Sequence, residues 1–311
     1  MPWNIQLGKH LWLRFLLVGI LIALLFNVVG AGAVAGDRSQ APTVPAACDP
    51  LPPGATAESQ ANSMIVALNQ WRVANGYTVV AYNAQLASAA LAHSQDMSQN
   101  NYVNHTGRDG SSPGQRATTA GYNWQLIGEN LEAGLADAAA IIERWWRQSP
   151  PYLHVMQMPV REVGVGYVYD PNDQAGVDLG DGQIGGPYCH YWTLMVGTRA
   201  QVYPVVINRG AAATNSRNVM VTIGIGSSAS LSEAPFVRFA AQPLTPAQWD
   251  GVPWIAFTGQ EIPFTLPAGD GVKTVYGQVK LMNALPWDAV SATIRLATAS
   301  QRRVYLPAIR R

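Results

Sequence analysis

The hydrophobic pattern of this 311-residue chain changes its period near residue 160. Between residues 58 and 148, apolar side chains recur every three or four positions, which predicts amphipathic helices. Beyond residue 160 apolar and other side chains alternate, beginning with residues 162–169, and this period of two predicts strands. Helices followed by antiparallel strands indicate an α+β fold.

Capping residues and prolines predict where the helices begin and end. Asparagine, serine and aspartate side chains can accept hydrogen bonds from the first free N–H groups of a helix. Proline is tolerated in the first turn, but it interrupts a helix interior. The expected bounds are Glu58 to Asn75-Gly76 for the first helix, Asn83 as the cap of the second, Ser112-Pro113 to Gly121 for the third, and Asp137 to Ser149-Pro150-Pro151 for the fourth.

The helical pattern disappears after Arg199. Short runs with strand character follow, separated by Gly, Pro, Asn and Asp, and this spacing predicts a small β-sandwich. We therefore expect one domain over residues 58–199 and a second, all-β domain over residues 200–311. The strand candidates are residues 202–209, 218–225, 236–240, 254–258, 273–281 and 291–298.

The N-terminus has the organisation of a secretory signal peptide. Basic residues precede a charge-free apolar run, Phe15–Val29, and small residues follow as far as Ala35. This order predicts a signal peptide over residues 1–35, followed by a Pro/Ala-rich linker over residues 36–57. An uncleaved membrane anchor is the alternative, because the run nearly reaches spanning length. In both cases the rest of the chain is expected outside the cytoplasm, and secretion is favoured.

The chain has two cysteines, Cys48 and Cys189. An exported chain meets an oxidising environment, in which a pair of cysteines is expected to form a disulfide. The bond would close a long loop, so the chain-entropy model predicts a stabilisation of about 4–5 kcal/mol. We therefore expect Cys48 and Cys189 to be bonded to each other.

A series of short motifs runs through the first domain in a distinctive order. The motifs are His93-Ser94-Gln95-Asp96-Met97, Asn104-His105-Thr106, Asp109-Gly110-Ser111-Ser112-Pro113, Arg116, Gly121-Tyr122, Gly128-Glu129-Asn130, Trp145-Trp146, Ser149-Pro150, Gly164-Val165-Gly166 and Tyr191-Trp192-Thr193. In this combination the chain resembles the bacterial branch of the CAP (SCP-like) superfamily. The resemblance implies a three-layer α/β/α sandwich with a cleft lined by His and Glu, while the second half resembles β-rich modules of secreted proteins.

Two of these motifs carry the candidate site, since the resemblance implies that His105 and Glu129 face each other in the cleft. A carboxylate can fix the tautomer of an imidazole and raise its basicity, and the two groups together can bind a divalent metal such as zinc. A hydrogen-bonded pair that only holds two loops together is the alternative. His93 lies on the apolar face of its predicted helix, which favours a structural role.

The resemblance adds three residues to the predicted binding cleft: Asn130, His154 and Tyr191. The family pattern W-x-x-S-P-x-H would place its histidine at Tyr152, so His154 is a candidate third metal ligand after His105 and Glu129. Tyr191 stands where animal members carry a histidine, and the complete animal ligand set is absent. We therefore expect a weakly bound, exchangeable zinc ion or none.

Three functions fit these observations. The first is non-enzymatic binding of an apolar or amphipathic ligand, a cell-envelope component or an extracellular protein. The second is metal-assisted extracellular hydrolysis by His105 and Glu129, and the third is adhesion through the β-rich domain. The incomplete ligand set and the lack of a G-x-S-x-G nucleophile motif favour binding. A net charge of +1 without a Lys/Arg cluster argues against nucleic acid as a partner, and membrane contact is expected only through an uncleaved anchor.

Overall fold

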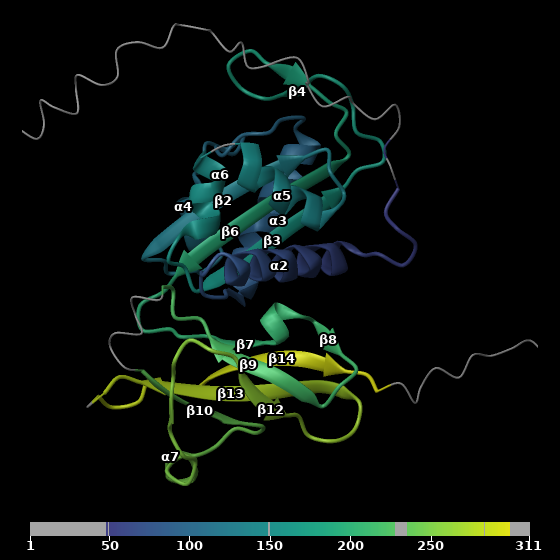
Figure 1. Cartoon of the computed structure of the whole chain (residues 1–311). Helices are drawn as coiled ribbons and strands as arrows, with labels where there is room; N and C mark the ends of the chain where they lie inside the picture. The colour runs from purple at the N-terminus through teal and green to yellow at the C-terminus, as the bar shows by residue number, and fades with distance from the viewer. Residues whose placement is uncertain (1–47, 49, 149, 228–234, 283, 299–311) are drawn as a thin grey trace, which may run out of the picture. The chain divides into compact units, whose positions relative to one another are not determined.

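The computed structural model describes residues 48, 50–148, 150–227, 235–282 and 284–298, with helices and strands labelled as in Figure 1. The predicted signal peptide and the first part of the predicted linker lie outside these residues. In the described ranges, no helix combines the length and the apolar character needed to cross a membrane.

A four-stranded sheet organises the N-terminal half of the chain (Figure 1). Its strands lie in the order β1–β3–β6–β2, with β1 parallel to β3 and the other neighbours antiparallel. The strand predicted over residues 162–169 is β3, and it pairs along its length with β6. The strands are β1 (Ala81–Tyr82), β2 (Leu126–Ala133), β3 (Glu162–Tyr169) and β6 (His190–Thr198).

Helices cover both faces of this sheet. Successive side chains of a strand point to opposite faces, so Leu194 and Met195 of β6 report on the two sides. Leu194 packs in one buried cluster with residues of α2, α5 and α6, whereas Met195 packs in another with residues of α3 and α4. The expected three-layer α/β/α sandwich is confirmed. The helices are α2 (Ala57–Ala74), α3 (Ala84–Gln99), α4 (Pro113–Thr119), α5 (Ala138–Gln148) and α6 (Pro150–Gln157).

The predicted helix starts are confirmed by their caps. The Asn83 side chain accepts hydrogen bonds from the backbone N–H groups of Gln85 and Leu86, and Asp137 accepts one from Ala140. One expectation was incomplete, because the chain begins another helix, α6, at Pro150 instead of leaving helical structure there. Proline fits this position because the first turn of a helix needs no N–H donor.

The second half of the described chain is built from two β-sheets. The five-stranded sheet has the order β11–β10–β13–β14–β8, and the three-stranded sheet has the order β12–β9–β7. Val221 of β9 and Val275 of β13 share one buried cluster, which confirms the β-sandwich-like arrangement. The elements are β7 (Val205–Ile207), β8 (Ala213–Thr214), β9 (Asn218–Ile223), β10 (Phe236–Ala240), β11 (Ile255–Ala256), β12 (Ile262–Thr265), β13 (Gly271–Lys280) and β14 (Val290–Leu296), with the short helices η1 (Asn208–Gly210) and α7 (Pro246–Trp249).

Residues on both sides of the predicted boundary at residue 199 pack together. The buried Asn69 side chain of α2 donates hydrogen bonds to the carbonyls of Val80 and Arg209, at 2.9 Å each. Val206 of β7 also packs with Val79 and Ala81. The division into domains of residues 58–199 and 200–311 stays a prediction, and these contacts show that the second segment contributes to the packing of the first.

Candidate functional site

Glu129 lies at the centre of the candidate site. No strand was predicted around Glu129, but this residue occupies the middle of strand β2 and faces the layer of α3 and α4. Its side chain is only 1% exposed, and both carboxylate oxygens are engaged. His105 Nδ1 lies 2.8 Å from Oε1, and Arg116 donates to Oε2 at 2.7 Å. The structure therefore brings His105 and Glu129 together, as the resemblance implies.

The geometry assigns the tautomer of His105. An ionised carboxylate can only accept hydrogen bonds, so Nδ1 carries the proton that it donates to Glu129. In the neutral imidazole this leaves Nε2 with a lone pair. The His105 side chain is 56% exposed, in contrast to the buried carboxylate behind it. The site thus presents one oriented imidazole to the outside.

Helix α3 holds the loop that carries His105. The Nε2 atom of His93 lies 2.9 Å from the carbonyl oxygen of Asn104, the residue before His105. Burial lowers the pKa of His93, so the ring is neutral and Nε2 is the protonated donor. Asp96, one turn further along α3, accepts hydrogen bonds from the Tyr102 hydroxyl and the Arg108 backbone N–H. The predicted structural role of His93 fits these contacts, which position the site.

Arg116 of α4 is the functional residue that the sequence analysis left without a role. Besides Glu129, its guanidinium donates to the carbonyl oxygens of Ser111 at 2.8 Å and His105 at 3.0 Å. It therefore joins the His105 loop, helix α4 and strand β2. A buried carboxylate needs a compensating charge. In the sequence, the place of Arg116 in the motif series shortly before Glu129 makes it a candidate for this charge, and the structure selects it.

The central sheet separates other residues of the predicted cleft from His105 and Glu129. Asn130 follows Glu129 in β2, so its side chain points to the opposite face, where it donates to the carbonyl of Tyr152 at 3.1 Å. His154 is exposed on α6, one of the helices that cover that same opposite face. The prediction that Asn130 and His154 line one cleft with His105 and Glu129 is therefore wrong.

Tyr191 is also not part of an open cleft wall. Its side chain is fully buried, and its hydroxyl donates to the carboxylate of Asp173 at 3.0 Å. Burial, followed by the nearby charge of Asp173, raises the pKa of Tyr191. Tyr191 therefore stabilises the loop that contains Asp173, and the prediction that it binds a ligand is corrected.

The predicted metal ligands do not form a complete set. Among the described residues, no group of three or more His, Cys, Asp or Glu side chains is arranged to hold a metal ion. His154 does not join His105 and Glu129, for the reason of strand alternation given above. Since both oxygens of Glu129 already accept charge-assisted hydrogen bonds, the pair has the form of an ion-pair network.

Two open pockets border this network. The first has a volume of about 660 Å³ and the second a volume of about 420 Å³, and both are lined by Asp109, Ser111 and Thr119. Arg116 lines the second pocket. The first pocket also contains Trp124, whose side chain is 42% exposed. Its remaining lining residues are Gly110, Ser112, Gly114, Gln115, Thr118 and Ile127.

A second buried carboxylate, Glu132, lies on the other face of the sheet. Its Oε1 accepts a hydrogen bond from Arg144 at 2.9 Å. Burial raises the pKa of Glu132 to about 7, and the positive charge of Arg144 only partly opposes this effect. Glu132 therefore changes its protonation state near neutral pH.

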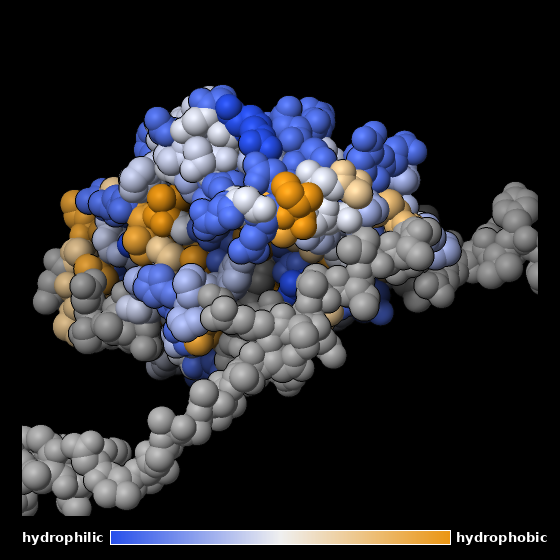
Figure 2. Space-filling model, turned by 90° about the horizontal axis from the view of Figure 1, so that it is seen from above, coloured by the Kyte–Doolittle hydropathy of each residue, from blue (hydrophilic) through white to orange (hydrophobic). Residues whose placement is uncertain are grey.

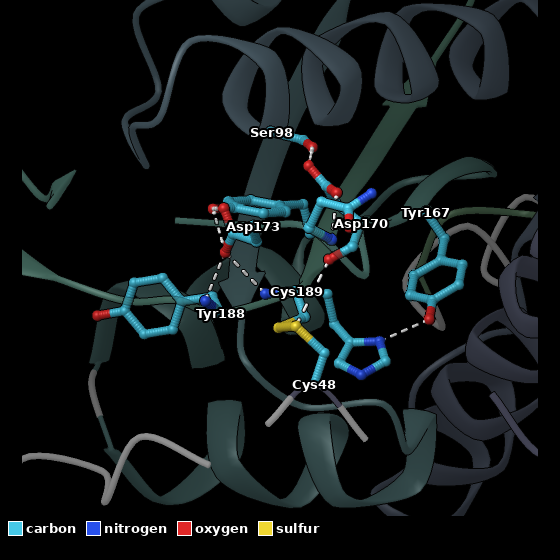
Figure 3. The surroundings of a disulfide bond; sticks show 10 residues. Cys48, Ser98, Tyr167, Asp170, Asp173, Tyr188 and Cys189 are labelled. Atoms are coloured by element: carbon cyan, nitrogen blue, oxygen red, sulfur yellow. Dashed lines mark hydrogen bonds between the residues drawn. A yellow bond between two sulfur atoms is a disulfide. The ribbon is translucent and has the colours of Figure 1, made fainter. Parts of the chain in front are cut away.

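The predicted disulfide between Cys48 and Cys189 is confirmed, with the two Cα atoms 5.6 Å apart. Figure 3 shows its surroundings, in which the carboxylate of Asp173 accepts hydrogen bonds from the backbone N–H groups of Tyr188 and Cys189. The disulfide attaches the start of the described chain to the end of the loop that precedes β6. It thereby closes a loop of 141 residues that contains the entire candidate site.

Comparisons with known proteins find relatives of unassigned function. Two proteins of Bacillus subtilis (strain 168) are similar: the uncharacterized membrane protein YlbC, 28% identical over 32% of this chain, and the uncharacterized protein YkwD, 24% identical over 43%. The matches span 28% and 54% of the lengths of these relatives.

Solved structures with partial similarity include an extracellular protein with an SCP domain from Bacillus anthracis str. Ames. It is 22% identical, with 49% of this chain and 45% of that chain covered and a TM-score of 0.38. An outer surface protein of Borrelia burgdorferi is 14% identical, with 47% and 96% covered and a TM-score of 0.39. Residues 66–195 match the sequence model of CAP, the cysteine-rich secretory protein family. This segment, which contains His105, Arg116 and Glu129, is the part of the chain that is similar to the CAP family.

Proposed function

We propose that this chain is a secreted, non-enzymatic binding protein that recognises a component of the cell envelope beside His105 and Arg116. The observation that carries this proposal is the state of Glu129, whose two oxygens are both occupied by cationic or N–H donors in a buried position. A carboxylate held in this way orients His105 and Arg116 but has no oxygen left over for a substrate.

The same geometry argues against the alternative of metal-assisted hydrolysis. Such a mechanism needs a set of metal ligands, and the described residues offer no group of three or more His, Cys, Asp or Glu side chains that could hold an ion. Glu129 is buried behind His105, and its charge is compensated by Arg116. His105 alone offers a single imidazole nitrogen, which suits a hydrogen bond to a ligand better than the construction of a metal centre.

The surface favours an envelope component of polar character over an apolar ligand. Figure 2 shows one face of the molecule, on which hydrophilic residues dominate and hydrophobic ones form separate patches. The two pockets beside the site combine Ser, Thr, Gln, Asp, His and Arg side chains with small or apolar residues, so their surface is mixed and not purely apolar. A site for a lipid would require a continuous apolar surface.

Export is supported by two observations. The structure contains a disulfide between Cys48 and Cys189, and disulfides form and persist mainly in oxidising compartments outside the cytoplasm. The apolar run that precedes Ala35 supports a secretory signal. Adhesion through the β-rich domain is a less supported alternative, because no described feature of that domain favours a particular partner.

The test is co-sedimentation of the purified, disulfide-bonded protein with cell envelopes isolated from the organism that naturally encodes it. His105→Ala should release most of the bound protein. His154→Ala is the matched control, since it removes an exposed histidine from the opposite face and should leave binding unchanged. Equal loss in both variants, or no loss in either, would contradict the proposal. Release of soluble envelope fragments by the wild type but not by His105→Ala would show hydrolysis instead.

A further inference from the structure

The edge of the Trp124 ring packs against helix α4. Its Nε1–H lies 3.1 Å from the Gly114 carbonyl oxygen and 3.2 Å from the Thr118 hydroxyl oxygen, so the indole donor is satisfied within the protein. A Cβ atom at Gly114 would lie 2.8 Å from the Trp124 ring, which shows how closely the ring approaches the helix backbone. With 42% of the side chain exposed, the ring is an immobilised apolar surface inside the larger pocket.

Hydroxyl, amide and carboxylate groups surround this ring. Ser112, Gln115 and Thr118 line the same pocket, and their side chains can donate and accept hydrogen bonds. Asp109, Ser111 and Thr119 line both pockets, so the polar surface continues from Trp124 toward Arg116. The combination of one flat aromatic surface with many short polar side chains suits a ligand that has both flat C–H surfaces and many hydroxyl groups.

Charge excludes the main competing ligand, a stacked nucleobase with its phosphate. Among the residues that line the two pockets, Arg116 is the one with a permanent positive charge, and its side chain is 9% exposed and bound to Glu129. The exposed carboxylate of Asp109, shared by both pockets, would repel a phosphate. The surroundings therefore favour an uncharged polar ligand.

From these observations we infer that the surface around α4, from Trp124 to Asp109 and Ser111, binds a neutral β-1,4-linked glycan. Equatorial β-1,4 linkages leave the axial C–H groups of each sugar ring on two flat faces, and such a face can pack on the exposed indole. The hydroxyl groups at the ring edge then reach the Ser, Thr, Gln and Asp side chains. This inference rests on the proposed envelope-binding function and names the chemical class of its ligand.

The test is calorimetric titration of the purified, disulfide-bonded protein with two probes, a β-1,4-linked glucose oligomer and a β-1,4-linked N-acetylglucosamine oligomer. We expect at least one probe to bind with a Kd of about 1 mM or lower. Trp124→Ala should weaken this binding by about tenfold or more, since it removes the stacking surface. Tyr82→Ala is the matched control, because Tyr82 is another exposed aromatic residue, 60% exposed on β1, and its loss should change nothing.

A second variant separates stacking from folding. Gly114→Ala adds a methyl group that must displace the Trp124 ring, while alanine favours the helix more than glycine does. It should weaken glycan binding at least fivefold with no loss of thermal stability. The inference would be overturned if the wild type bound neither probe with a Kd of about 1 mM or lower. It would also be overturned if Trp124→Ala and Gly114→Ala both bound the probe as tightly as the wild type does. If His105→Ala still abolishes envelope binding in that case, the proposed function stands and only the glycan assignment fails.

Discussion

Removal of the cation beside Glu129 should be among the most destabilising single changes in this protein. Arg116→Met keeps the length of the apolar stem but leaves a carboxylate that is 1% exposed with His105 as its remaining partner. The variant also removes the hydrogen bonds to the carbonyls of Ser111 and His105. Breaking a buried ion pair from one side costs about 3–5 kcal/mol, because the remaining charge is uncompensated. For a chain of this size, that corresponds to a Tm lower by roughly 10 °C.

The double variant Arg116→Met/Glu129→Met tests whether the cost arises from the buried, uncompensated charge of Glu129 or from lost packing. If the isolated carboxylate causes the loss, removing it as well should recover about 2 kcal/mol or more relative to the sum of the two single changes. Urea unfolding of the disulfide-bonded proteins, followed by circular dichroism, measures these free energies. A cost below about 1 kcal/mol for Arg116→Met would refute this reasoning, as would single changes that add within about 0.5 kcal/mol.

Three further predictions follow from buried contacts elsewhere. Replacing both cysteines by serine should lower the free energy of unfolding by about 5 kcal/mol, since the disulfide closes a 141-residue loop. Urea unfolding at neutral pH measures this loss, and a much smaller loss would contradict the prediction. Because the folded pKa of Glu132, about 7, lies above its usual 4.5, folding is penalised as pH rises through this window. Between pH 4.5 and pH 8 the wild type should therefore lose about 3 kcal/mol more stability than Glu132→Gln, and parallel pH profiles of the two proteins would disprove this. Truncation after residue 200 should leave a folded but less stable domain, because Asn69, Val79 and Ala81 lose their contacts with Val206 and Arg209; an unfolded product with its disulfide intact would contradict the domain boundary.

Much of the architecture could be predicted from short-range signals in the sequence. The caps Asn83, Ser112 and Asp137 and the periods of 3.6 and 2 act over a few residues, so they mark helix starts and strands without knowledge of the fold. The cysteine pair was predicted because the chain has only two, Cys48 and Cys189. Strand β2 was missed, since the Gly and Asn that flank Glu129 are typical of loops and only pairing with β6 makes the segment extended.

The composition of the site was decided by tertiary structure. Glu129 and Asn130 are neighbours in the sequence, yet the pairing of β2 in the sheet places them on opposite faces, so a cleft that contains His105 and Glu129 cannot include Asn130. Likewise, the burial of Glu129 requires a compensating cation, and only the packing of α4 against the sheet shows that Arg116 supplies it. Local patterns specify which segments form strands and helices, whereas strand register and helix packing, which depend on contacts between distant residues, determine which side chains meet.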